Sequence, residues 1–175
     1  MKTVLFLVVS LTTIATALGQ GQINFQTRIP PDILDAKVIR FGDWGSTTGL
    51  GAGEGFTAEL VMVGKGEALT PLLPKTVFGT RTPADTYYVE PVIVTVPGFP
   101  AGSQIMVRMR VFETVAGNYE SSRFKTISSD VHLTLGSPDS PANLNGLTTM
   151  GLVNIPEPST LALLAFASMG LFFRR

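Results

Sequence analysis

The chain has 175 residues, of which 45% are hydrophobic, and it carries 13 basic and 13 acidic side chains. This length fits one domain with tails, and the near-neutral middle of the chain has no basic cluster, which excludes a surface that displaces counterions from nucleic-acid phosphates. The absence of cysteine excludes thiol catalysis, disulfides and cysteine-type zinc sites.

The first 19 residues have the three-part layout of a secretory signal peptide. A basic start at Lys2 precedes an apolar stretch over residues 4–14, and small residues follow at Ala17 and Gly19. We expect signal peptidase to cleave after Gly19, with cleavage after Ala17 as the alternative. The apolar stretch is shorter than a membrane-spanning helix needs to be. The layout therefore predicts a cleaved export signal in preference to a membrane anchor.

The region over residues 20–136 has the pattern of an all-β domain. Gly and Pro recur about every ten residues, and the runs between them are rich in Val, Ile, Thr and Phe. We predict an antiparallel β-sandwich, Ig-like or jelly-roll-like, flanked by an N-terminal signal helix and a C-terminal hydrophobic helix. The predicted strands cover residues 22–26, 37–41, 56–63, 92–96, 104–114 and 131–135.

The longest predicted strand, residues 104–114, shows the clearest alternation of side chains. Arg108 and Arg110 fall on one face, and two arginines on one strand face are typical of a solvated surface. The opposite face carries Ile105, Val107, Met109 and Val111. After this domain we expect a linker over residues 137–155, with room for one last strand over 144–155.

A glycine-rich stretch over residues 41–55 raises the question of a phosphate-binding loop. Such a loop needs a strand before it and a helix after it, whereas the pattern here predicts a strand from Phe56. We therefore interpret the stretch as an inter-strand loop. Trp44 within it, beside Asp43, could stack on a sugar ring, and the alternative is a Trp that packs back on the edge of the domain.

Residues for catalysis or metal binding are sparse. His132 is the one histidine, on the predicted outer face of its strand, and no nucleophile or zincin motif accompanies it. Asp32 and Asp35 form a carboxylate pair, but Pro30-Pro31 marks that pair as loop. Asp43, Glu54 and Asp130 lack the spacing of a calcium loop. We expect no catalytic residue, no cofactor, no metal and no enzymatic activity.

The C-terminal segment over residues 156–175 consists of an uncharged apolar run with polar residues at both ends. Pro156-Glu157-Pro158 opens it, residues 161–173 carry no charge, and Arg174-Arg175 close it. As a helix the uncharged run rises about 20 Å, against a bilayer core of about 30 Å, and snorkelling arginines narrow that gap. Because the run is apolar all round, membrane insertion is favoured over a core helix.

This combination resembles the PEP-CTERM sorting signal. The residues that carry the resemblance are Pro156, Glu157, Pro158, the uncharged apolar run, Arg174 and Arg175, together with the N-terminal signal peptide, although the basic end has only two arginines. The resemblance implies an exported protein of a Gram-negative bacterium that makes extracellular polysaccharide. It also implies processing of the tail by a membrane enzyme, an exosortase. The same tail is sometimes labelled an ice-binding-protein C-terminal domain, which describes the tail and not an activity.

The domain resembles small PEP-CTERM proteins of the Verrucomicrobia type, through residues 55–61, 100–111, 118–122 and 144–147. That resemblance implies architecture and destination and transfers no catalytic residues. We expect a surface or extracellular-matrix protein of unknown molecular activity that passes through the cell-envelope membrane. The alternative is a carbohydrate-binding module that contacts extracellular polysaccharide through Trp44, with Tyr87, Tyr88 or Tyr119.

Overall fold

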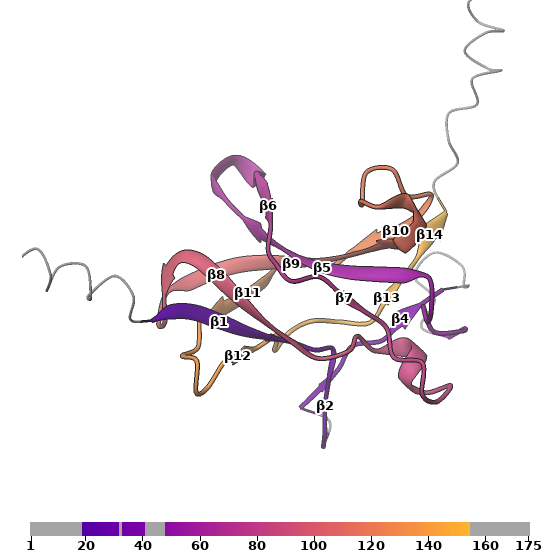
Figure 1. Ribbon diagram of the computed structural model, residues 1–175, viewed down its shortest axis with the longest axis horizontal. Coiled ribbons are helices and arrows are strands. Elements are labelled where there is room, and N and C mark those ends of the chain that lie inside the picture. Colours follow the sequence, from indigo (N-terminus) through magenta and orange to yellow (C-terminus); the bar gives the residue numbers. More distant parts are fainter. Residues whose placement is uncertain (1–18, 32, 41–47, 155–175) are drawn as a thin grey trace, which may run out of the picture.

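The computed structural model describes residues 19–31, 33–40 and 48–154, and it shows an all-β protein with several sheets (Figure 1). The two terminal helices predicted from the sequence fall outside these residues. Within the described ranges, no helix has the length and apolar character needed to cross a membrane.

Most strands are short, and two long pairs organise the rest. Three single-turn 3₁₀ helices lie in connections: η1 (Lys65–Glu67), η2 (Asp85–Tyr87) and η3 (Thr114–Ala116). The strands are β1 (Gln20–Phe25), β2 (Arg28–Ile29), β3 (Leu34–Asp35), β4 (Val38–Ile39), β5 (Phe56–Val63), β6 (Leu69–Pro71), β7 (Thr76–Val77), β8 (Val92–Pro100), β9 (Gln104–Glu113), β10 (Phe124–Ile127), β11 (Val131–Thr134), β12 (Ala142–Asn143), β13 (Met150–Gly151) and β14 (Val153–Asn154).

The larger sheet is built around the antiparallel pair β5 and β9, which runs from Phe56 opposite Glu113 to Met62 opposite Val107. β6 and β7 pair with the edge of β5 that faces away from β9. β10 and β11 share the other side of β9, and β14 extends β10 as the outermost strand. The two long strands therefore fix the position of every other element of this sheet.

The smaller sheet joins early and late parts of the chain. β1 pairs antiparallel with β8 and parallel with β12, where Ile23 lies opposite Ala142. A two-stranded parallel ribbon repeats this arrangement, because β4 pairs with β13 and Val38 lies opposite Met150. A second ribbon joins β2 to β3. The N-terminal strands thus find partners near the C-terminal end of the described chain.

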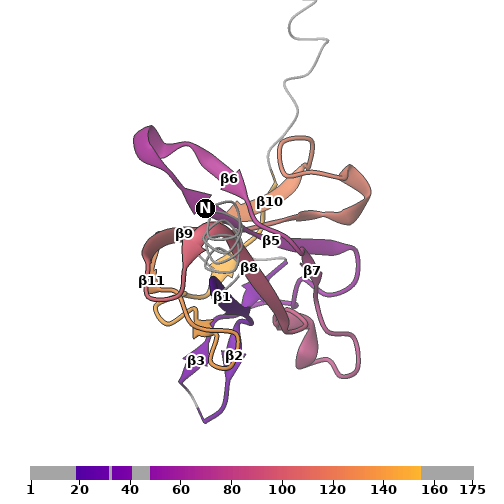
Figure 2. The same ribbon diagram turned by 60° about the vertical axis from the view of Figure 1, so that its left-hand side comes forward.

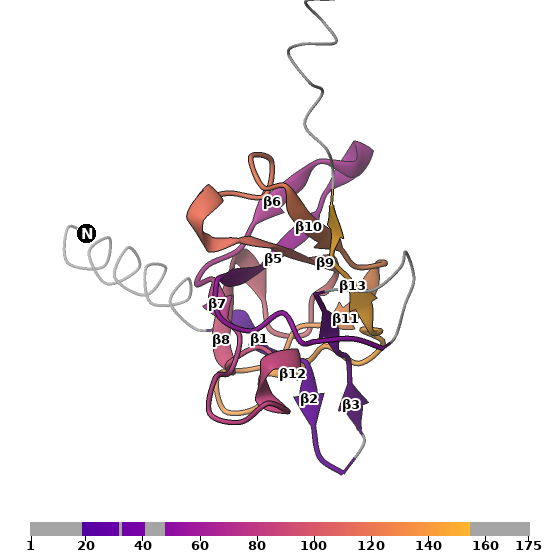
Figure 3. The same ribbon diagram turned by 90° about the vertical axis from the view of Figure 1, so that its right-hand side faces the viewer.

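One hydrophobic core receives side chains from both sheets. Figures 2 and 3 show β5, β9 and β10 above β1, and Figure 3 also shows β12 below them. The buried apolar side chains of the two sheets form a single cluster. The predicted alternation in β9 is confirmed, since its inward residues are at most 8% exposed. They are Ile105, Val107, Met109 and Val111, and they pack in the same cluster as Ile23, Phe25, Leu60, Val94 and Val96.

The predicted strands over residues 22–26, 37–41, 56–63, 92–96, 104–114 and 131–135 all contain observed strands. Prediction missed β2, β3, β6, β7, β10 and β12, which are two to four residues long. A segment that short shows too little alternation to distinguish it from a loop.

The prediction of a linker after residue 136 needs correction. Gly136 pairs with Gln22 through two backbone hydrogen bonds of 3.0 and 3.1 Å, and a Cβ at Gly136 would overlap the backbone of Ser140 and Ala142. The following residues return to the core, where four of their side chains are at most 9% exposed: Leu144, Leu147, Met150 and Leu152. The single last strand predicted over 144–155 is instead the two short strands β13 and β14.

The prediction that the Arg108 and Arg110 face of β9 is exposed to solvent is also wrong in part, because much of this face of the larger sheet is buried. On β5, the outward side chains of Glu59 and Val61 are 3% and 0% exposed, and Phe112 on β9 is 1% exposed. Arg110 retains only 13% of its side-chain exposure. Connections from elsewhere in the sequence cover this face, which a strand pattern alone cannot reveal.

Candidate functional site

The described chain ends on the outer edge of the larger sheet. There β14 pairs with β10, so that Asn154 lies opposite Phe124 and Val153 opposite Lys125. Pro156 follows Asn154 by two residues, which limits its Cα to about 7 Å from that of Asn154. The predicted sorting residues lie outside the described ranges: Pro156, Glu157, Pro158, Arg174 and Arg175. The edge from which they emerge is well defined.

Beside this edge stands the connection between β9 and β10, residues 114–123, which we name the exit loop. Figures 1 and 3 both place it at the same end of the molecule as β14. The carboxylate of Glu113 closes its base, because Oε2 accepts hydrogen bonds from Ser122 Oγ at 3.2 Å, Arg123 N at 3.1 Å and Phe124 N at 3.2 Å. The loop therefore starts and ends at one anchored point.

The inside of the exit loop is also held by hydrogen bonds. Gly117 adopts a left-handed backbone with φ of 74° and donates its N–H to Thr114 O at 3.1 Å. Asn118 Oδ1 accepts from Ser121 N at 2.9 Å and from Ser121 Oγ at 3.0 Å. Thr114 N donates to Gly55 O at 2.7 Å. These contacts fix the loop in one shape before any partner binds.

Tyr119 connects the exit loop to the face of the sheet. The guanidinium of Arg110 lies 4.6 Å from the centre of its ring and Lys125 Nζ lies 5.1 Å from it. Lys125 Nζ also donates to Glu120 O at 2.8 Å. Burial raises the pKa of Tyr119 above its ordinary value. The ring is thus already in contact with two cations of the domain itself.

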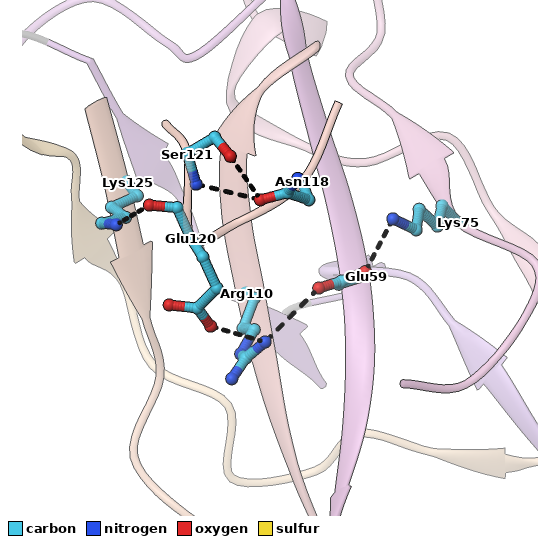
Figure 4. Close-up of polar contacts among 7 residues, drawn as sticks. All are labelled: Glu59, Lys75, Arg110, Asn118, Glu120, Ser121 and Lys125. Carbon is cyan, nitrogen blue, oxygen red and sulfur yellow. Dashed lines mark hydrogen bonds and ion pairs between the residues drawn. The ribbon is translucent and has the colours of Figure 1, made fainter. Parts of the chain in front are cut away.

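Beneath the loop, a row of charges crosses the sheet (Figure 4). Glu59 binds Lys75 Nζ at 3.0 Å and Arg110 Nη1 at 3.8 Å, and the same Arg110 atom lies 3.5 Å from Glu120. Arg110 Nε is buried without a hydrogen-bond partner. Both carboxylate oxygens of Glu59 therefore face a cation, and these ion pairs link β5 to β9 and to the segment between β6 and β7.

The three tyrosines among the predicted sugar-binding aromatics do not form one surface. Trp44 lies outside the described residues. The hydroxyl of Tyr87 donates to Gly49 O at 2.6 Å, and Tyr87 lines an open groove of about 670 Å³ that also includes Arg40 and Leu50. Tyr87 and Tyr88 meet edge to face at 6.4 Å, whereas Tyr119 belongs to the exit loop.

Tyr88 is committed to neighbours on the β2–β3 ribbon. Its hydroxyl donates to Asp35 Oδ1 at 2.6 Å, and the guanidinium of Arg28 lies 5.1 Å from the centre of its ring. Burial, followed by the hydrogen bond and charge of Asp35, raises the pKa of Tyr88 to about 12. Asp35, half of the carboxylate pair noted in the sequence, is therefore engaged; Asp32 lies outside the described residues.

His132 is exposed on the outer face of β11, as predicted, and lies opposite Met106. It borders an open groove of about 640 Å³ at the end of the sheet, lined mainly by apolar side chains such as Met62, Phe99 and Leu133. In the part of the chain that the structure describes, no three His, Asp or Glu side chains gather as a metal site.

Asp130 and the glycine-rich stretch are also engaged. Asp130 accepts hydrogen bonds from Arg108, from Nε and, at 3.3 Å, from Nη2, and this pairing holds the pKa of Asp130 below its ordinary value. In the described half of the stretch, Ala52 N donates to Val38 O at 3.0 Å and Gly53 N to Thr86 O at 2.9 Å. These N–H groups are therefore not available to a phosphate.

The predicted signal cleavage after Gly19 stays a prediction, and the described chain begins at that residue. Gly19 O accepts a hydrogen bond from Ala101 N at 2.9 Å, and β1 begins at the next residue. Cleavage after Gly19 would leave β1 complete. Ala17, the alternative site, lies outside the described residues. Sequence analysis missed the hydrogen bonds between the Glu113 carboxylate and Ser122. The local signals for a turn between these two residues were Gly117 and Asn118, since both residue types favour turns.

Comparison with known proteins identifies the family of the C-terminal segment. No curated protein and no solved structure matches this chain significantly. One family model does match, and it covers residues 154–175: the PEP-CTERM protein-sorting motif, a signal of the kind that exosortase membrane enzymes recognise. The match begins at Asn154, the last residue of β14. The chain is therefore a PEP-CTERM sorting-domain protein, an all-β domain with a sorting signal directly attached to its edge strand.

Proposed function

We propose that this protein is an exported, non-catalytic component of the cell surface or of the extracellular polysaccharide matrix of a Gram-negative bacterium. One observation carries the proposal: the sorting motif follows directly on a β domain whose described carboxylates and histidine are paired or exposed singly. The signal peptide over residues 1–19 supports export. Signal peptidase and an exosortase-like membrane enzyme are the two processing partners.

The tail supplies the sorting step. Pro156-Glu157-Pro158 is the recognition element, residues 161–173 hold the chain in the membrane, and Arg174-Arg175 stay on the cytoplasmic side. The domain itself we take to be a β-sandwich, Ig-like or jelly-roll-like, because two sheets share one core. In this proposal the molecule needs no cofactor, and its folded domain is the cargo that the tail delivers.

Replacing Pro156-Glu157-Pro158 with three alanines tests the proposal in the native host. We expect export to continue and removal of the tail to stop, because the signal peptide acts independently of the tail. Intact mass of the protein from membrane and extracellular fractions measures both ends of the chain. A matched control replaces Ser159 and Thr160 with alanine, which alters the same segment and keeps the tripeptide.

Two results would contradict the sorting proposal. Tail removal that continues at the normal rate in the triple-alanine chain would exclude the tripeptide as the recognition element. A wild-type species in the membrane fraction that still ends at Arg175 would show that the tail is a permanent anchor.

A second candidate function is binding of carbohydrate. The open groove beside Tyr87 favours it, since Leu50 and Gly51 in its lining belong to the same glycine-rich stretch as Trp44. We expect Trp44→Ala to abolish binding on a glycan array and Trp44→Phe to retain part of it, because phenylalanine keeps an aromatic ring. Absence of binding to every glycan by the wild-type protein would rule this candidate out.

A further inference from the structure

The distance between the sorting tripeptide and the exit loop is limited by covalent geometry. Asn154 pairs with Phe124, and paired strands hold opposite Cα atoms about 5 Å apart. Pro156 adds at most about 7 Å and Pro158 about 14 Å from Asn154. The tripeptide therefore lies within about 20 Å of the base of the exit loop, wherever the tail points.

A protein that reads the tripeptide will cover more than three residues. Specific interfaces bury about 800 Å² on each partner and involve about 20–30 residues a side. A patch of that area is about 28 Å across if it is square. A partner centred on Pro156-Glu157-Pro158 extends about 14 Å to each side, and Glu157 lies at most about 16 Å from Phe124. When the tail lies along the domain, the surface around the base of the exit loop is therefore within reach of that partner.

The exit loop has two properties of a docking element. Its shape is fixed by the Glu113 carboxylate at the base and by Asn118 within, so binding costs little conformational entropy. At η3 it presents Val115, whose side chain is 92% exposed and is the most exposed large apolar side chain within the described ranges. A single exposed apolar side chain is ordinary. Val115 is of interest because it lies on a hydrogen-bonded loop that leads into β10, the partner of the strand from which the tail continues.

We propose that the exit loop is a second recognition element for the membrane enzyme that processes the tail, with Val115 as its contact. This inference rests on the proposed sorting function and adds the folded domain to what the enzyme reads. The enzyme thereby distinguishes a folded substrate from an unfolded one, because residues 114–123 keep this shape only when Glu113 on β9 meets Ser122 and Phe124 next to β14.

The test measures the initial rate of tail removal from the full chain in the native host. Val115→Asp places a charge at the contact, and we expect processing about tenfold slower, since burial of a valine contributes about that factor. The matched control is Leu73→Asp, at a side chain that is 67% exposed between β6 and β7, on the opposite edge of the sheet from β14. We expect no change there. Equal export and equal protease resistance of both variants establish that the domain still folds.

A second variant tests whether the effect of Val115 depends on the distance between the exit loop and the tripeptide. Inserting Gly-Ser-Gly-Ser after Asn154 moves the tripeptide up to about 14 Å farther from the loop. We expect this spaced chain to be processed about tenfold more slowly, and Val115→Asp to add nothing further to it, because two changes that remove one contact are not additive.

The outcomes distinguish this inference from the proposed function. Wild-type processing of Val115→Asp, or effects of the two changes that multiply, would overturn the docking role while the triple-alanine result still stood. Failure of the triple-alanine test itself would remove the sorting function.

Discussion

Glu59 is the residue whose role in the structure differs most from its role in the sequence pattern. In the alternation of residues 56–63, Glu59 falls on the same mixed face as Thr57, Val61 and Val63. In the structure it is 3% exposed and lies between Lys75 and Arg110. A buried acid of this kind is tolerated because both flanking cations are present, and loss of one member leaves the other charges without compensation.

We therefore predict that Glu59→Ala lowers the free energy of unfolding by about 3 kcal/mol or more, the cost of breaking a buried ion pair. Urea denaturation of residues 20–154, followed by fluorescence or circular dichroism, measures it. Glu120→Ala is the matched control, since Glu120 approaches the same Arg110 but its side chain is 74% exposed. An exposed pair contributes at most about 1 kcal/mol. Equal losses in the two variants would mean that Glu59 is not buried as described.

At the scale of elements, the informative segment is residues 137–154. Its composition, with Ser-Pro-Asp-Ser-Pro, is that of a loop, and its strands β12, β13 and β14 are two residues long. Its attachment to the fold comes from buried side chains between the strands. Leu144 is fully buried, and Leu152 N donates to Ile39 O at 2.8 Å. The segment completes the domain.

Leu144→Ala tests whether this segment belongs to the core. We predict a loss of about 2–5 kcal/mol in the free energy of unfolding, the usual cost of a cavity left by a buried leucine. Asp139→Ala, at an exposed position of the same segment, should change it by less than about 0.5 kcal/mol. Urea denaturation of residues 20–154 again supplies the measurement. A Leu144→Ala protein as stable as the wild type would restore the interpretation of a linker.

These elements show why sequence analysis succeeded in some places and failed in others. Long strands such as β5 and β9 carry enough alternation to be located from their own residues, and the inward face of β9 was assigned correctly. The burial of Glu59 depends on the exit loop and on Lys75, which are remote in sequence. The pairing of β4 with β13 likewise has no local signal, because two residues cannot show a period.

At the scale of the whole molecule, the sorting tail was the most predictable part and the folded site beside it the least. The tail is recognised from residue order alone: a tripeptide, an uncharged run and a basic end. The exit loop is recognised only from the hydrogen bonds that Glu113, at the end of β9, accepts from Ser122 and from Phe124 at the start of β10. The sequence therefore indicates where the protein goes more clearly than what its partners touch.

The pairing of early strands with late ones has a consequence for the timing of export. β1 needs β12, and β4 needs β13, so a chain that crosses a membrane from its N-terminus cannot complete either sheet until residues 142–151 have followed. Closing loops of that length is slow compared with local folding. The β1–β12 pairing and the β4–β13 ribbon can therefore form only late in passage, after residues 142–151 have crossed.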